Sequence, residues 1–111
     1  MEKILDLKDL MSACSKVLLV EESLSERKRL VRWLQRHGKT ELKGVGSGEA
    51  LVMLRDENID LLVLGRVGHK HVLRELVQNA RERNPQVTLA LVDGNWVSPW
   101  TVKQVDGIVR A

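Results

Sequence analysis

The sequence predicts an α/β domain built on one doubly wound parallel sheet with helices on both faces. Short, almost wholly apolar runs, such as residues 16–20 and 59–64, are typical of strands that are buried on both sides. These runs alternate with longer segments whose apolar residues recur at helical spacing, which is the pattern of βαβ units. With 111 residues, 43% of them hydrophobic and 30% charged, the chain has the length and balance of one globular domain.

Five strands are expected, each bounded by charged or turn-forming residues. The first strand stops at two glutamates, and the second is weaker because polar residues interrupt it. A glycine-containing loop follows the third, and an aspartate–glycine turn precedes the last. The expected strands are 16–20, 41–45, 59–64, 87–92 and 108–110.

Four helices should connect these strands. Ser23 with Glu26 three residues later forms a capping box, which predicts a helix from there to about residue 37. Ser47 is expected to cap the second helix, and the helix of residues 69–83 should stop before Pro85. A short helix or an irregular connection is expected over residues 99–105.

The N-terminal segment has its own apolar pattern. Ile4, Leu7, Leu10 and Met11 recur at helical spacing, which predicts an amphipathic helix within residues 1–12. We therefore divide the chain into an N-terminal amphipathic helix, residues 1–15, and a domain of residues 16–111.

Cysteine content, apolar run length and net charge indicate where the protein is located and which partners it binds. The single cysteine, Cys14, cannot form an internal disulfide, which fits a reducing cytoplasm. No apolar run approaches the ~20 residues that span a bilayer, and the N-terminus does not resemble a signal peptide. A net charge of +3 is well below that of a dedicated nucleic-acid binder. We expect a cytoplasmic protein with no membrane partner and no nucleic-acid partner for this domain alone.

Several phrases of the sequence together resemble the receiver domain of bacterial response regulators. Their order and spacing extend over residues 16–110, and the resemblance implies a flavodoxin-like sheet of five parallel strands in the order 2-1-3-4-5. In such a sheet, function gathers at the carboxyl ends of the strands. The phrases are residues 17–22, 47–51, 59–64, 81–85 and 106–107.

The same resemblance implies that the phosphorylation chemistry is missing. Glu21 and Glu22 match the acidic pair that holds Mg²⁺ in active members, but the phospho-acceptor aspartate matches Gly65, which has no side chain. The hydroxyl-bearing position matches Asp93, and the aromatic switch position matches Ile108. We therefore predict a degenerate pseudo-receiver with a vestigial phosphorylation crevice, no catalytic residues, no enzymatic activity, no small-molecule substrate and no cofactor, with residual Mg²⁺ binding not expected.

Two features of the sequence depart from the architecture that the resemblance implies. The span between Asp93 and Asp106 is short for the family, so the fourth helix should be reduced. The chain stops where the fifth helix would begin, which would leave an apolar sheet face uncovered. We expect the N-terminal helix to replace that cover or to pair with another subunit, although a longer protein cut at this point would give the same sequence.

The loop after the third strand is a candidate anion site. Arg66, Gly68, His69 and Lys70 lead into a helix N-terminus, where backbone N–H groups and the helix dipole favour anions. An ordinary solvated loop explains the same residues. We predict no metal site, because His69 and His71 lie two apart and cannot share one helical face.

Two surfaces are candidates for partner binding. Trp96, Trp100, Val102 and Val105 flank the shortened connection and could anchor an interface, or they could fill the gap that the reduced helix leaves. The helix of about residues 24–37 carries cations that could meet DNA phosphates or an acidic protein, or simply face water. These cations are Arg27, Lys28, Arg29, Arg32 and Arg36.

These observations predict a phosphorylation-independent module for protein–protein interaction or homodimerisation in bacterial signal transduction or transcription control. The alternatives are a sensor of small anionic ligands in the vestigial crevice and a nucleic-acid binder that uses the basic helix.

Overall fold

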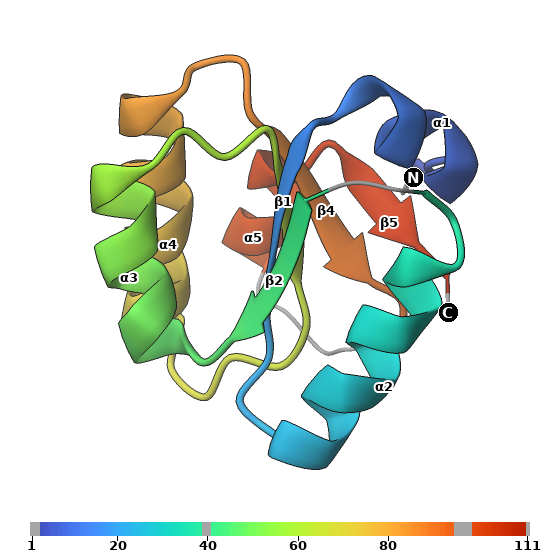
Figure 1. Cartoon of the computed structure of the whole chain (residues 1–111). Coiled ribbons are helices and arrows are strands. Elements are labelled where there is room, and N and C mark those ends of the chain that lie inside the picture. The colour runs from blue at the N-terminus through green and yellow to red at the C-terminus, as the bar shows by residue number, and fades with distance from the viewer. Residues whose placement is uncertain (1–2, 39–40, 95–98, 111) are drawn as a thin grey trace.

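The computed structural model of the chain describes residues 3–38, 41–94 and 99–110. Its centre is a sheet of five parallel strands in the order β2-β1-β3-β4-β5 (Figure 1). The predicted fold class and strand order are therefore confirmed. The strands are β1 (Lys16–Val20), β2 (Glu41–Val45), β3 (Leu61–Leu64), β4 (Thr88–Val92) and β5 (Gly107–Val109).

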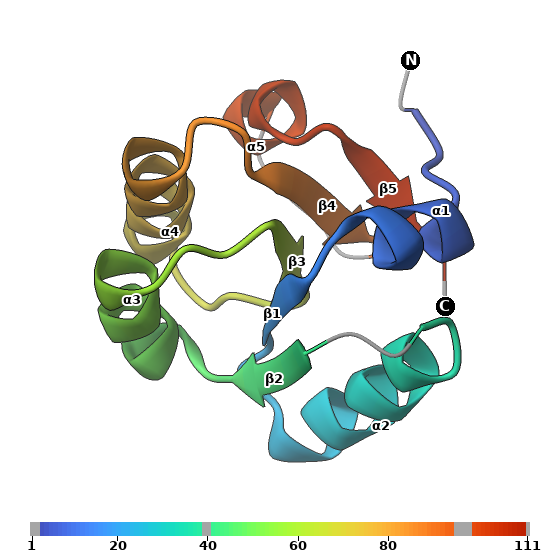
Figure 2. The same ribbon diagram turned by 45° about the horizontal axis from the view of Figure 1, so that its top comes forward.

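The helices divide between the two faces of the sheet. Figures 1 and 2 show α1 and α2 on one face and α3, α4 and α5 on the other. The helices are α1 (Leu7–Ala13), α2 (Leu24–Gln35), α3 (Ser47–Asp56), α4 (Lys70–Arg83) and α5 (Pro99–Gln104). With six residues, α5 is the reduced fourth helix of the predicted receiver-like domain.

Alternate residues of the strands feed two apolar layers. Leu18 and Leu62 point to the layer under α3 and α4, whereas Leu19 and Val63 point to the layer under α1 and α2. All four side chains are fully buried. Because both faces are covered, the central strands have continuous apolar sequences, which is why the sequence predicts them so clearly.

The N-terminal helix supplies part of the second layer. Leu7 and Met11 of α1 are 8% and 3% exposed and pack in the same core as Val109 of β5 and Trp33 of α2. The N-terminal segment thus covers this face of the sheet beside β5 within one chain, as expected. Helix α1 therefore shares one apolar core with the sheet and with α2.

The helix is shorter than the sequence predicts, and the residues before it are extended. The Leu5 N–H donates to the Ile108 carbonyl at 2.8 Å, and the Ile108 N–H donates to the Lys3 carbonyl at 2.8 Å. Ile4 and Ile108 form a parallel bridge, so residues 3–5 lie along the outer edge of β5. Asp6 then starts the helix by accepting a hydrogen bond from the Asp9 N–H at 3.2 Å.

Asp60, which directly precedes β3, connects that strand to the amino end of β1. One oxygen of its carboxylate accepts hydrogen bonds from the Ser15 hydroxyl at 2.6 Å and from the backbone N–H groups of Ser15 and Lys16 at 3.2 and 3.0 Å. These bonds favour the ionised form and hold the pKa of Asp60 below its ordinary value of 3.8, with the Ser15 hydroxyl the largest cause.

Replacing Asp60 by asparagine is expected to lower the free energy of unfolding at neutral pH by about 1 kcal/mol, a modest loss because the carboxylate is partly exposed. The folded-state pKa is depressed, so this contribution is present above the ordinary pKa of 3.8 and is lost as the pH falls through the lower folded-state value. Urea denaturation at neutral pH and below pH 3.8 should therefore show a difference that shrinks in acid. The exposed Asp56→Asn is the control for net charge, and an Asp60 effect of equal size at both pH values would contradict the assignment.

Candidate functional site

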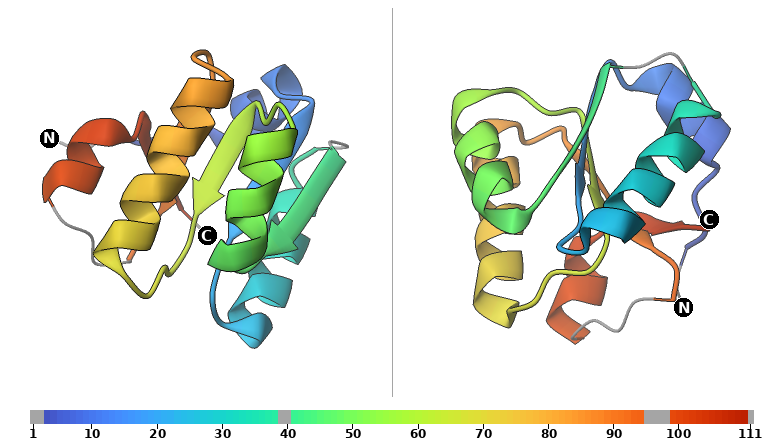
Figure 3. Two further views of the ribbon diagram at one scale, coloured as in Figure 1. Left: turned by 90° about the vertical axis from the view of Figure 1, so that its left-hand side faces the viewer. Right: turned by 60° about the horizontal axis from the view of Figure 1, so that its bottom comes forward.

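The residues matched to the phosphorylation crevice follow three strands at the same edge of the sheet. Glu21 follows β1, Gly65 follows β3 and Asp93 follows β4. Because neighbouring parallel strands end together, this edge is where an open α/β sheet carries its site. The right-hand view of Figure 3 brings this edge of the domain forward.

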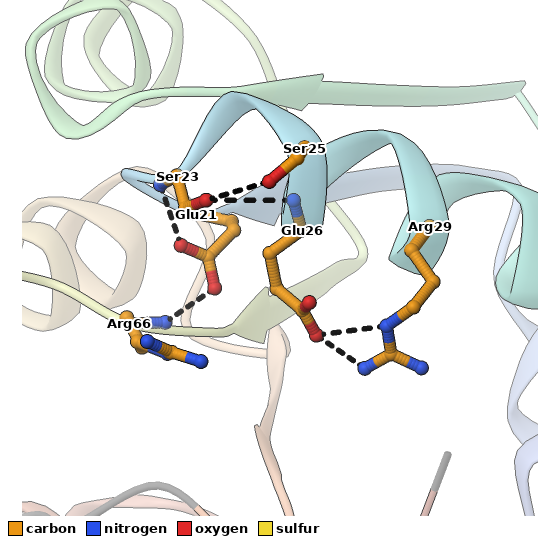
Figure 4. A network of polar contacts seen from close by, with 6 residues as sticks. All are labelled: Glu21, Ser23, Ser25, Glu26, Arg29 and Arg66. Carbon is orange, nitrogen blue, oxygen red and sulfur yellow. Dashed lines mark hydrogen bonds and ion pairs between the residues drawn. The ribbon is translucent and has the colours of Figure 1, made fainter.

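Glu21 is a buried carboxylate at this edge. Its side chain is 1% exposed. One carboxylate oxygen accepts a hydrogen bond from the Ser23 N–H at 2.7 Å, and the other accepts one from the Arg66 N–H at 3.1 Å (Figure 4). The carboxylate therefore links the loop after β1 to the loop after β3. Both of these hydrogen-bond donors are backbone amides.

Gly65 lies directly against this carboxylate. A Cβ atom built on Gly65 would lie 2.9 Å from Oε1 of Glu21 and 3.1 Å from the carbonyl oxygen of Val20. Real Cβ atoms essentially never approach other heavy atoms closer than 3.0 Å. The space that a side chain of residue 65 would need is thus occupied by Glu21.

Glu22 has a structural contact of its own. Its Oε1 atom accepts a hydrogen bond from the Ser47 N–H at 3.0 Å. The N-cap residue of α3 is Gly46, which has no side chain to cap the helix, and Ser47 is already the first helical residue. The prediction that Ser47 caps this helix is therefore wrong, because a carboxylate from the β1 end performs the capping.

The predicted capping box at α2 is only half formed. The Ser23 hydroxyl accepts a long hydrogen bond from the Glu26 N–H at 3.5 Å. The Glu26 carboxylate does not return to the Ser23 N–H but pairs with Arg29, which lowers the pKa of Glu26 (Figure 4). Glu21 takes the place that the box assigns to Glu26, so burial of Glu21 is coupled to the start of α2.

Asp93 contacts residues other than Glu21 and Gly65. Its Oδ1 atom accepts a hydrogen bond from the Gly94 N–H at 3.0 Å, and its Oδ2 atom lies 3.4 Å from Nε of Arg110. The structure therefore brings Glu21 and Gly65 together and pairs Asp93 with Arg110, the residue that follows β5. Within residues 3–38, 41–94 and 99–110, no group of three His, Cys, Asp or Glu side chains is placed to hold a metal ion.

The candidate anion-binding residues border this crevice on its exposed side. Arg66, Gly68, His69 and Lys70 are all exposed, and His69 caps α4 without a side-chain hydrogen bond. The Arg66 N–H, which could bind an anion, already binds the Glu21 carboxylate. An added anion beside Gly65 would meet the buried carboxylate of Glu21.

Trp100 is half-buried, and it contacts the domain on two sides. Its ring packs with Val105 against the core layer under α4, and the Arg74 guanidinium lies 4.7 Å from the ring centroid. Such stacking is a cation–π contact. These contacts agree with filling of the gap beside the reduced α5. Trp96 and the side chain of Val102 lie outside the described residues.

The cations of α2 have different roles. Arg27 donates from Nε to the Glu21 carbonyl at 3.0 Å, and Arg29 pairs with Glu26. Lys28 and Arg32 are exposed and line a groove of 460 Å³ between α2 and the edge strand β2. Sequence reasoning identified the basic helix but not this groove, since nothing in the sequence shows that α2 lies along β2.

The three-dimensional comparison finds receiver domains. A response regulator of Burkholderia pseudomallei, with a phosphorylated aspartic acid, a calcium ion and citrate, aligns over 86% of this chain at a TM-score of 0.67 and 18% identity. The chain spans 59% of that regulator's length. A receiver protein of Sinorhizobium medicae aligns over 87% of this chain and 80% of its own at a TM-score of 0.64 and 20% identity.

A third similar structure is the response regulator TrrA in complex with the histidine kinase ThkA, with a TM-score of 0.66 and 22% identity over 87% of this chain and 85% of the other. Neither a protein-family profile nor a curated protein matches the sequence. None of the helices in the described ranges is long and apolar enough to cross a membrane. The chain therefore has the receiver-domain fold.

Proposed function

We propose that this domain is a phosphorylation-independent receiver that acts by binding other proteins in a bacterial signalling or transcription-control system. One observation carries the proposal: the buried Glu21 carboxylate fills the space beside Gly65. Phosphotransfer by a receiver needs a nucleophilic carboxylate and a metal ion held by acidic side chains. Gly65 offers no nucleophile, and both oxygens of Glu21 already accept backbone hydrogen bonds.

Without phosphotransfer, the domain would act through the surface that its fold presents to other proteins. The sheet is covered on both faces, and the carboxylates of Glu21 and Glu22 accept hydrogen bonds from backbone amides at its carboxyl edge. The structurally similar TrrA was solved in complex with a histidine kinase, which makes protein surfaces of signalling systems a reasonable class of partner.

Exposure to acetyl phosphate and Mg²⁺ tests the proposal. Intact-protein mass spectrometry should show no phosphoryl group added, while an active response regulator treated in parallel should gain one. Sedimentation velocity of the domain should be unchanged by beryllofluoride, since no aspartate is present to bind it at residue 65. A phosphoryl adduct, or a change of oligomeric state with beryllofluoride, would contradict the proposed function.

A further inference from the structure

A groove between α2 and the open edge of the sheet combines three features that suit a peptide. Its α2 side is one stripe of the helix, and its other side is the central part of β2. The groove extends along most of α2, which for residues 24–35 corresponds to about 16 Å. It is lined by Leu24, Arg27, Lys28, Val31, Arg32, Gln35, Leu42, Lys43 and Gly44.

The first feature is an unpaired strand edge. β2 is the outermost strand, and among the described residues it pairs only with β1. The Glu41 N–H donates to Ser15, and the Val45 carbonyl accepts from Glu21, so these residues direct their backbone groups toward β1. Because the direction alternates along a strand, the N–H and C=O groups of Leu42 and Gly44 point outward.

The second feature is charge of one sign. Four cations line the groove, and none of its lining residues is acidic. Arg27 is partly fixed by the Glu21 carbonyl, and Lys43 lies 3.9 Å from Glu49, whereas Lys28 and Arg32 face the groove as exposed groups. Such a field attracts an acidic ligand.

The third feature is an apolar floor. Leu24 is 59% exposed, and Val31 and Leu42, which also line the groove, are half-buried. α2 can approach β2 closely because residue 44 is glycine, whose missing Cβ would lie 2.6 Å from Cγ2 of Val31. Double-stranded nucleic acid would satisfy the cations but would use neither this floor nor the strand edge.

We propose that this groove binds an extended, acidic segment of a partner protein, which adds to β2 as a further strand. Its backbone would pair with Leu42 and Gly44, its carboxylates would meet Lys28 and Arg32, and its alternate apolar side chains would cover Leu24. About five extended residues span the length of the groove. A second copy of this chain is not the occupant, because a two-fold contact here would bring two cationic grooves together.

This inference rests on the proposed role in protein binding and names its partner class. The probe is a synthetic peptide of about seven residues that alternates glutamate and valine. In ¹⁵N NMR spectra of the full chain, the Leu42 and Gly44 amides should shift saturably, and their hydrogen exchange should slow. Two control peptides should not produce these effects. In one, lysine replaces each glutamate, which reverses the charge. The other is the acidic peptide N-methylated at alternate residues, which removes backbone N–H donors.

The variant Lys28→Glu with Arg32→Glu should bind the acidic peptide at least about tenfold more weakly. The control is Lys8→Glu with Lys103→Glu, two exposed cations on α1 and α5, which makes the same change of net charge and should leave affinity nearly unchanged. Equal weakening in both variants would overturn the proposal. So would silence of the Leu42 and Gly44 amides, or a response of those amides to duplex DNA but not to the peptide.

The two proposals fail separately. A domain that takes up a phosphoryl group yet binds the acidic peptide would contradict the proposed function and keep the groove. A domain that is inert to acetyl phosphate and shows no response to the peptide would lose only the groove.

Discussion

Restoring an aspartate at residue 65 is expected to destabilise the domain by about 3 kcal/mol or more and to leave it unable to accept a phosphoryl group. The Cβ of the new side chain would lie 2.9 Å from Oε1 of Glu21, which is 1% exposed. A second carboxylate would then share a site that has room for one, and like charges in a buried site disfavour each other strongly.

Two further variants separate crowding from charge. Gly65→Ala adds only the Cβ and should cost about 1–2 kcal/mol, since the Glu21 side chain must shift slightly. Combining Gly65→Asp with Glu21→Ala should recover part of the loss, and urea denaturation of the four proteins of this double-mutant cycle gives the coupling free energy. Additive effects of the two substitutions would show that Glu21 does not block residue 65.

Deleting residues 1–14 is expected to remove about 5 kcal/mol of stability or more, which is comparable to the whole stability of many domains. The deletion removes the buried Leu7 and Met11 together with the segment that pairs with β5. It exposes apolar residues of the core under α1, so self-association or loss of cooperative folding should follow. An unchanged melting temperature and oligomeric state after the deletion would contradict the role of this segment as a cover.

Adding one Cβ atom at residue 107 tests the contact between residues 3–5 and β5 without removing either segment. A Cβ on residue 107 would lie 2.6 Å from Cγ of Leu5 and 2.6 Å from the Lys3 carbonyl oxygen, so Gly107→Ala should displace residues 3–5 from β5 and cost about 1–3 kcal/mol. The matched control is Gly48→Ala in α3, where nothing lies within 4 Å of the added atom. That change should be neutral or stabilise the helix by about 0.5–1 kcal/mol. Equal melting temperatures for the two variants would argue against close packing at Gly107.

The fold could be predicted from the sequence because its main determinant is local. Strands buried on both faces, such as β1 and β3, are continuous apolar runs, and the amphipathic spacing of α2 and α4 shows which side of each helix is buried. The pairing of residues 3–5 with β5 could not be predicted in the same way. Ile4 fits helical spacing with Leu7 and Met11 equally well, and the deciding hydrogen bonds come from a strand about a hundred residues later.

The site was predictable in its membership but not in its contacts. The resemblance placed Glu21 and Gly65 at the same sheet edge, and the structure agrees. That Glu21 would be buried depends on backbone donors from two loops, one of them 45 residues away, which no sequence pattern encodes. The role of Glu22 as the cap of α3 has the same origin, since the missing cap at Gly46 is visible in the sequence but its replacement is not.

We propose that the Glu21 carboxylate keeps this crevice closed to metal and phosphate. The most direct test is to record ¹⁵N amide spectra while adding Mg²⁺ and then beryllofluoride, following Ser23 and Arg66, whose N–H groups bind Glu21. We expect both resonances, and that of Gly65, to stay in place through the titration. Saturable shifts at these three amides would show that the crevice binds Mg²⁺ or beryllofluoride, and that Glu21 does not close it.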